Sequence, residues 1–184
     1  MIEGMLVELF KTEERACILR YAMFRKSFRA SEVSRVTGVT KGLVSRYLRL
    51  LQAYDLLQKT GREYSPQDGP NSRTIKILLN LERIDLPALS LVPARGLGLY
   101  GSLASGTNDL ESDLDFWIKA DSAPSESLLA RLQRDLSLKA ESEVNLLVLT
   151  PEKLERMKTE DTPFYNSLIM NFLTLKGEPL EEYR

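Results

Sequence analysis

Apolar residues in the first third of the chain recur at helical spacing in three consecutive segments. A helix is predicted over residues 12–24, with Thr12 as its N-cap and acidic residues in its first turn. A short helix over 32–36 follows, with Ser31 as its expected N-cap. The third helix, over 41–54, has a buried stripe with spacing i, i+3, i+4 and i+7, formed by Val44, Tyr47, Leu48 and Leu51.

The polar face of the third predicted helix is basic, and a hairpin pattern follows it. That face carries Lys41, Ser45, Arg46 and Arg49. After Asp55, a short apolar run, Gly61 and a polar run predict a β-hairpin over residues 56–65. The stretch from Ala30 to Leu51 resembles the MarR/ArsR-style winged helix-turn-helix. By that resemblance residues 41–49 are the recognition helix and 59–62 the wing.

The winged-helix resemblance implies contact with DNA or RNA. Basic side chains neutralise phosphates and polar side chains reach base edges in the major groove. The predicted DNA-binding residues are Lys41, Ser45, Arg46, Arg49, Lys59 and Arg62. The alternative is a winged helix used for protein docking or dimerisation, with a solvated basic face.

The rest of the chain alternates short apolar strands with amphipathic helices. An apolar connector over 73–81 fits helix or strand, with helix favoured, and Pro87 and Pro93 mark further loop. The remaining segments are predicted as strands over 97–100, 114–118 and 143–149, helices over 127–138, 151–158 and 163–172, and an edge strand over 173–176. This order predicts an α+β domain with a mixed β-sheet flanked by helices. We therefore expect a winged helix-turn-helix domain over 1–66, a connector over 67–92 and a second domain over 93–184.

Charge and composition narrow the chemistry. Residues 1–66 carry twelve Lys/Arg against seven Asp/Glu, whereas residues 67–184 carry thirteen against nineteen, so the two halves suit different partners. The absence of histidine removes the usual general base and the commonest zinc ligand, and the single Cys17 excludes an internal disulfide. We see no signal peptide and no apolar run of membrane-spanning length, so we expect a cytoplasmic protein without a membrane partner.

The most informative motif is Gly101-Ser102, followed after ten residues by Asp113-Leu114-Asp115. Gly101 lets the backbone approach a ligand, and Ser102 is the expected N-cap of a short helix whose free N–H groups favour phosphate. Asp113 and Asp115 lie on the same face of a strand, so that their carboxylates can hold Mg²⁺ against a triphosphate. The alternative is a capped turn followed by an edge strand with solvated acids.

This motif, with Ser112, Leu114 and Phe116 around the two acids, resembles the minimal nucleotidyltransferases of the polymerase-β-like superfamily. The resemblance implies that Gly101, Ser102 and Ser112 bind the nucleotide and that Asp113 and Asp115 bind two metal ions and are catalytic. The family's third carboxylate falls on Asn145, which cannot act as a base. Glu143, on the same face of the strand, is either its substitute or a solvated residue at the start of the strand.

Two functions follow from these features. The first is Mg²⁺-dependent transfer of a nucleoside monophosphate, with AMP from ATP favoured, to an acceptor hydroxyl. Enzymes with this motif resemble the antitoxin partners of HEPN toxins, which attach AMP to a protein tyrosine. The acceptor would lie on a partner protein, on a small molecule or across a homodimer interface. The alternative is a nucleotide-sensing DNA-binding transcription regulator whose transferase domain is catalytically weak.

Overall fold

The computed structural model describes residues 4–84, 89, 93–140 and 142–181. The chain divides into two compact units, Met1–Leu79 and Asn80–Arg184. The division lies in the segment predicted as a connector, much of which is helix α5 (Pro70–Leu81). This helix was favoured over a strand from the sequence, and the structure confirms it. Pro87, predicted as loop, lies outside the described residues.

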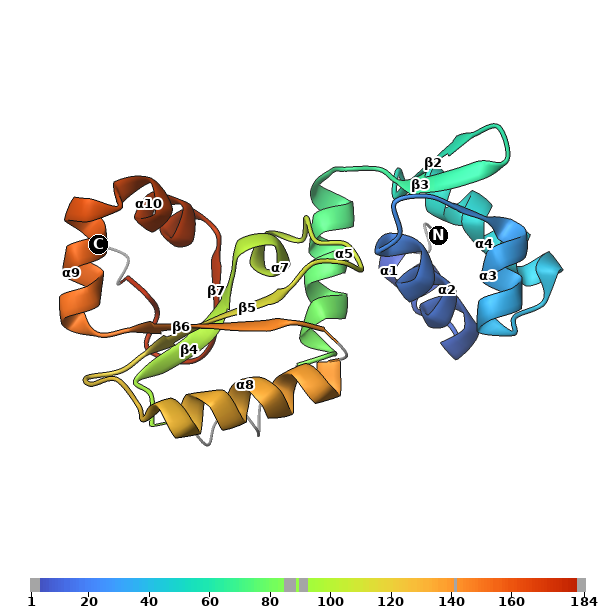
Figure 1. Ribbon diagram of the computed structural model, residues 1–184. Coiled ribbons are helices and arrows are strands. Elements are labelled where there is room, and N and C mark those ends of the chain that lie inside the picture. The colour runs from blue at the N-terminus through green and yellow to red at the C-terminus, as the bar shows by residue number, and fades with distance from the viewer. Residues whose placement is uncertain (1–3, 85–88, 90–92, 141, 182–184) are drawn as a thin grey trace. The chain divides into compact units, whose positions relative to one another are not determined.

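The first unit consists of short helices and a small antiparallel sheet (Figure 1). Before α5 its helices are α1 (Met5–Leu9), α2 (Glu13–Met23), α3 (Ala30–Thr37) and α4 (Lys41–Ala53). Its strands, in the order β1-β3-β2, are β1 (Phe28–Arg29), β2 (Leu57–Thr60) and β3 (Glu63–Pro66). The stripe predicted for the third helix is buried, with Val44, Leu48 and Leu51 fully inaccessible. These elements follow the predicted order, while assignment to the winged-helix class stays a prediction.

The helix starts of the first unit were predicted with mixed success. Thr12 is the N-cap of α2, and its hydroxyl accepts a hydrogen bond from the Arg15 N–H. Ser31 as the cap of α3 was wrong, because α3 starts at Ala30 and Arg29 is its N-cap. The Arg29 N–H donates to the Glu32 carboxylate at 3.0 Å, so Glu32 supplies the capping acceptor from inside the helix.

The second unit is built on a four-stranded mixed sheet in the order β6-β5-β4-β7. The strands are β4 (Gly96–Tyr100), β5 (Leu114–Lys119), β6 (Val144–Leu149) and β7 (Phe172–Gly177). β4 is antiparallel to β5 and β7, whereas β5 and β6 are parallel. The predicted α+β architecture with a mixed sheet is confirmed, as is the position of β7 at an edge.

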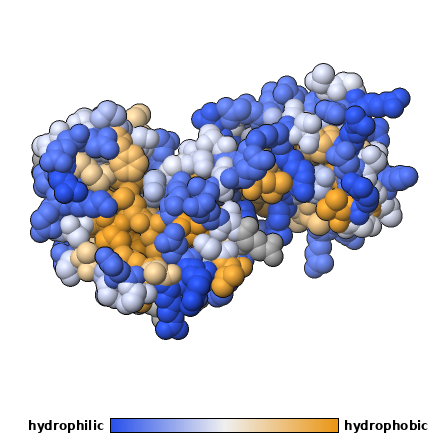
Figure 2. All heavy atoms as spheres, viewed as in Figure 1, coloured by the Kyte–Doolittle hydropathy of each residue, from blue (hydrophilic) through white to orange (hydrophobic). Residues whose placement is uncertain are grey.

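Helices flank this sheet and divide its core in two. They are α7 (Gly101–Ser105), α8 (Glu126–Ala140), α9 (Pro151–Glu160) and α10 (Thr162–Met170). Leu132 and Leu136 of α8 pack with Leu114 and Phe116 of β5, while Trp117 packs with residues of α9 and α10. Successive β5 side chains thus point to opposite faces, as the two-residue period of a strand requires. In the view of Figure 2 an apolar area of this unit lies between α8 and α10.

No helix in the described ranges combines the length and the apolar character needed to cross a bilayer.

Candidate functional site

The turn from β4 into α7 brings the backbone against a carboxylate. Gly101 has a φ of +67°, and a Cβ placed on it would lie 3.0 Å from Asp115 Oδ2. Glycine is therefore required both for the conformation and for the close approach. The Gly101 N–H donates to the Asn171 carbonyl at 3.1 Å, which ties the turn to the start of β7.

Ser102 does not cap α7, which corrects the expected helix start. α7 begins at Gly101, and Tyr100 is its N-cap. Because the Gly101 N–H is already bonded, the groups left to face an anion belong to Ser102 and the residues after it. Ser102 is half-buried in the first turn of α7.

Asp113 and Asp115 are brought together by an amide on the neighbouring strand. Asp115 pairs with Asn145 in the parallel register of β5 and β6. The Asn145 Nδ2 donates to Asp115 Oδ1 at 3.0 Å and is 3.4 Å from Asp113 Oδ2. Asp113 is exposed and Asp115 is half-buried, so the pair opens to solvent on one side.

The electrostatics of this pair favour a cation. Burial raises the pKa of the Asp115 carboxyl and the charge of Asp113 raises it further, while the Asn145 hydrogen bond works in the opposite direction. Burial and the Asp115 charge also raise the pKa of Tyr100 to about 12. Negative charge is thus held here at a cost that a bound cation would relieve.

Ser112 is engaged in the loop that precedes Asp113. Its hydroxyl accepts the Asp109 N–H at 2.9 Å and donates to Asp109 Oδ1 at 3.1 Å. The Glu111 N–H donates to the same Oδ1 at 3.0 Å, so Asp109 closes a compact turn. The Ser112 hydroxyl thus holds the turn, and its predicted contact with nucleotide stays a prediction.

Two buried asparagines behind the turn were not predicted. Asn80 and Asn108 are each 2% exposed, and the Nδ2 of each donates to the Oδ1 of the other, at 2.9 and 3.0 Å. The signal available in the sequence was a lone amide in the apolar run Leu78-Leu79-Asn80-Leu81. A polar side chain on a buried stripe requires a partner, but the sequence does not name that partner.

Glu143 does not join the two aspartates. Its side chain is exposed, and its carbonyl accepts the Leu114 N–H at 2.8 Å. Among the described residues, no three His, Cys, Asp or Glu side chains are grouped closely enough to hold a metal ion. The donor set at the site is therefore two carboxylates and the amide of Asn145, which suits a hard cation whose remaining ligands come from a triphosphate or water.

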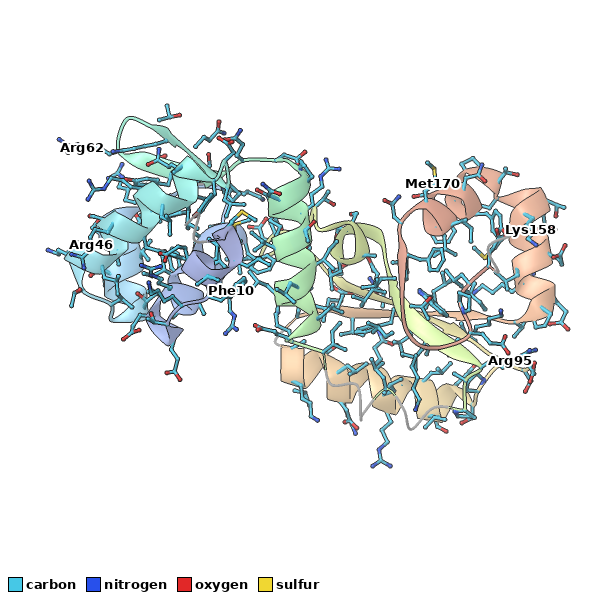
Figure 3. The ribbon with its side chains drawn as sticks, turned by 180° about the vertical axis from the view of Figure 1, so that it is seen from behind. Phe10, Arg46, Arg62, Arg95, Lys158 and Met170 are labelled. Carbon is cyan, nitrogen blue, oxygen red and sulfur yellow. The ribbon has the colours of Figure 1, made fainter. Side chains whose placement is uncertain are left out.

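The predicted nucleic-acid residues are exposed on α4 and on the β2–β3 hairpin. The set comprises Lys41, Ser45, Arg46, Arg49, Lys59 and Arg62. Figure 3 shows Arg46 and Arg62 projecting outward from these two elements. The Lys59 ammonium lies 5.3 Å from the centre of the Tyr64 ring, and Arg49 Nε donates to the Ser45 carbonyl.

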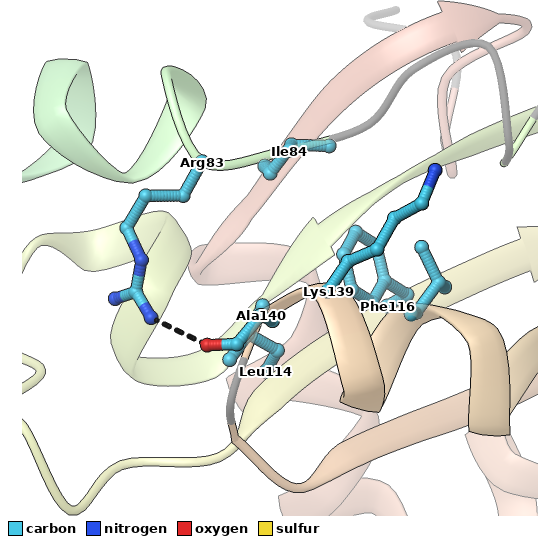
Figure 4. A pocket seen from close by; sticks show the side chains of 7 residues that line it. Arg83, Ile84, Leu114, Phe116, Lys139 and Ala140 are labelled. Atoms are coloured by element: carbon cyan, nitrogen blue, oxygen red, sulfur yellow. Dashed lines mark hydrogen bonds between the residues drawn. The ribbon is translucent and has the colours of Figure 1, made fainter.

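A small hollow of about 10 Å³ lies on the other face of β5 (Figure 4). Leu114 and Phe116 form its floor, and Arg83 Nη2 donates to the Ala140 carbonyl at its edge. Neither aspartate lines it, because the side chains alternate along β5. This hollow is separate from the carboxylate site.

Comparison with known proteins gives one family match, which lies within the second unit. A family model described as "Nucleotidyltransferase domain" matches residues 87–172. No curated protein sequence gives a significant match.

The similar solved structures are distant. One is a toxin–antitoxin crystal structure with AMP-PNP, 20% identical over 56% of this chain and 73% of that chain, with a TM-score of 0.37. Another is a tri-AMPylated HEPN toxin in complex with the MNT antitoxin from Shewanella oneidensis. It is 15% identical over 58% and 73% of the two chains, with a TM-score of 0.35.

Proposed function

We propose that this chain, whose residues 87–172 are a nucleotidyltransferase domain, moves AMP from ATP to a hydroxyl group of a partner protein. In this reaction the acceptor oxygen forms a bond to the α-phosphorus as the bond to the β-phosphate oxygen breaks. Pyrophosphate leaves, and the hydroxyl proton passes to solvent. The proposal joins the family of the domain to the geometry of its Gly101 turn and its paired aspartates.

The observation that carries the proposal is the contact between Gly101 and Asp115. A Cβ at Gly101 would lie 3.0 Å from Asp115 Oδ2, so the phosphate-binding turn and the metal-binding carboxylate share one edge. The first turn of α7, with the Ser102 hydroxyl, would hold the β- and γ-phosphates. The carboxylates would then face the α-phosphate and fix the angle of attack.

Asp113 and Asp115 would hold Mg²⁺, with the Asn145 side-chain oxygen as a weaker third donor after rotation of the amide. When bound, the metal neutralises charge on the triphosphate and lowers the pKa of the attacking hydroxyl. Asn145 itself has no basic group, so it cannot accept the proton of that hydroxyl. We therefore expect slow turnover.

A macromolecular acceptor fits the open side of the site. Asp113 is exposed and Asp115 only half-buried, so a side chain presented by another protein can reach the pair without entering a deep pocket. A tyrosine, serine or threonine hydroxyl on such a partner would supply the nucleophile.

Intact-mass analysis of co-expressed or co-purified partner proteins, after incubation with ATP and Mg²⁺, tests the transfer. A nucleotide adduct should appear with the wild type and be lost with Asp113→Asn/Asp115→Asn. Asp121→Asn removes an exposed acid just beyond the other end of β5, paired with Arg95, and is the matched control that should retain transfer. Undiminished transfer in the double variant would refute the assignment of the metal ligands.

We propose, as a second function, that the chain is a nucleotide-sensing regulator that binds DNA through its first unit. Arg46 and Arg49 are exposed on α4, and neither forms an ion pair within the part of the chain that the structure describes. As a recognition helix, α4 would place both against a major groove. Arg46→Ala/Arg49→Ala should weaken salt-dependent DNA binding and lower its salt slope by about 2.

The charge-matched control for this experiment is Arg131→Ala/Arg134→Ala on α8, which removes two exposed arginines from the other unit. DNA binding that is equally strong in both double variants would refute the recognition-helix assignment. That result would favour the alternative, in which the first unit serves for protein docking or dimerisation.

A further inference from the structure

We propose that Asn80 and Asn108 are positioning residues for nucleotidyl transfer. Their paired amides fix the loop that joins the phosphate-binding turn to Asp113. The proposal deepens the proposed function and rests on it, because it explains how the ten residues between Ser102 and Asp113 keep the two halves of the site in register.

The Asn80–Asn108 pair contacts both α7 and the loop that follows it. Asn80 comes from the end of α5, and Asn108 follows α7. Besides its bond to Asn108, the Asn80 Nδ2 donates to the Leu103 carbonyl in α7 at 3.1 Å. One buried amide thus holds the helix that carries Ser102 and the loop that leaves it.

The second half of the loop continues from Asn108 without a break. Asp109 closes the turn with Ser112, and the Ser142 hydroxyl donates to the Ser112 carbonyl at 3.3 Å. The residue after Ser112 is Asp113. The contacts therefore run from Asn80 through Asn108, Asp109 and Ser112 to the residue before Asp113.

Directional bonds are the reason to use amides here. Apolar side chains of the same branching, such as two leucines, would avoid the desolvation cost of burying polar groups, so hydrophobic burial alone does not call for asparagine. Two reciprocal amide bonds in a low-dielectric interior define both distance and orientation, which apolar contacts do not. The choice of residue thus indicates a requirement for geometry.

The test separates stability from positioning through three variants. Asn108→Leu leaves the Asn80 side-chain oxygen without its donor and the Asn80 Nδ2 with only the Leu103 carbonyl, and should lower both the melting temperature and the affinity for ATP–Mg²⁺. Asn80→Leu/Asn108→Leu replaces both amides and leaves only the Leu103 carbonyl without its donor, so it should regain part of the melting temperature that Asn108→Leu loses. Its nucleotide affinity, measured by titration calorimetry, should stay about 10–100-fold below the wild type, as for residues that support metal ligands. Leu132→Ala in α8 is the control for general destabilisation and should keep the wild-type affinity.

A double variant that regains both stability and affinity would overturn the proposal. Hydrogen exchange of the wild type, which needs no variant, gives a second test. The backbone amides of Asp109 and Glu111 should exchange with solvent as slowly as the backbone amides of β5. Exchange at the rate of an open loop would also overturn the proposal. Wild-type protein that binds no nucleotide would refute the proposed function, while the exchange result would still decide whether the loop is fixed.

Discussion

Replacing Asn145 by aspartate should make the stability of the second unit depend on bound metal, and it should raise the rate of nucleotidyl transfer. The substitution restores the carboxylate that the resemblance places at this position. It also removes the Nδ2 that donates to Asp115 at 3.0 Å and lies 3.4 Å from Asp113. Three carboxylates then meet without a donor between them, and only a cation can neutralise them.

The cost in the metal-free protein follows from those contacts. Hydrogen bonds to a charged group contribute about 1.5–3 kcal/mol. A new like charge about 4 Å away costs up to about 4 kcal/mol at an effective dielectric constant of 20, and less at this half-exposed site. We expect a net loss of about 2–4 kcal/mol in the unfolding free energy of the second unit. For a domain of its size, each kcal/mol corresponds to about 4–8 °C in melting temperature.

Thermal unfolding and single-turnover transfer measure the two sides of this prediction. Asn145→Asp should melt at least about 8 °C below the wild type in EDTA and regain that loss at saturating Mg²⁺. Its transfer rate should rise about 100-fold, the lower end of what a positioned general base contributes. Asn166→Asp adds the same charge on the exposed face of α10 and should change neither quantity. A variant whose melting temperature is insensitive to Mg²⁺ and whose transfer rate is unchanged would refute the role assigned to position 145.

Three further substitutions test the rest of the site. Gly101→Ala should lower the free energy of unfolding by about 1–2 kcal/mol and weaken ATP binding, because alanine is strained at φ +67° and its Cβ meets Asp115. Urea melts and calorimetry measure the two effects, and Gly69→Ala, which has open space around it, is the control. Gly98→Ala should prevent stable folding, since its Cβ would lie 2.0 Å from the Leu173 carbonyl oxygen; a circular dichroism melt like the wild type's would contradict this. Asp115→Asn should raise the metal-free melting temperature at pH 7, because the raised pKa of this carboxyl means that its charged form destabilises the fold. The difference from the wild type should shrink as pH falls through that pKa and the wild-type carboxyl is protonated; a difference independent of pH would contradict the assigned burial cost.

The parts of the site that the sequence predicted well depend on local rules. Asp113 and Asp115 share a face because side chains alternate along a strand, and Gly101 has the left-handed backbone expected of a glycine at a tight turn. Each of these statements needs only a few consecutive residues.

The parts that the sequence did not predict depend on partners far apart in the chain. Asn80 and Asn108 are 28 residues apart, and no pattern near either one names the other. The motif also does not indicate that the Ser112 hydroxyl donates to the Asp109 carboxylate in the loop before Asp113. Capping by Glu32 instead of Ser31 shows the same limitation on a smaller scale, since two neighbouring residues could both supply the acceptor.

The amide at position 145 connects the stability of this domain to its chemistry. In the absence of metal, the burial of Asp115 raises the pKa of its carboxyl, and repulsion by exposed Asp113 raises it further, so the charged form of Asp115 carries a cost. The Asn145 Nδ2 offsets part of that cost by donating to Asp115, so the fold keeps the two carboxylates together without a cation. The same amide cannot take a proton from an acceptor hydroxyl. Under the proposed function, a domain built this way would bind nucleotide at low metal concentration and transfer it slowly.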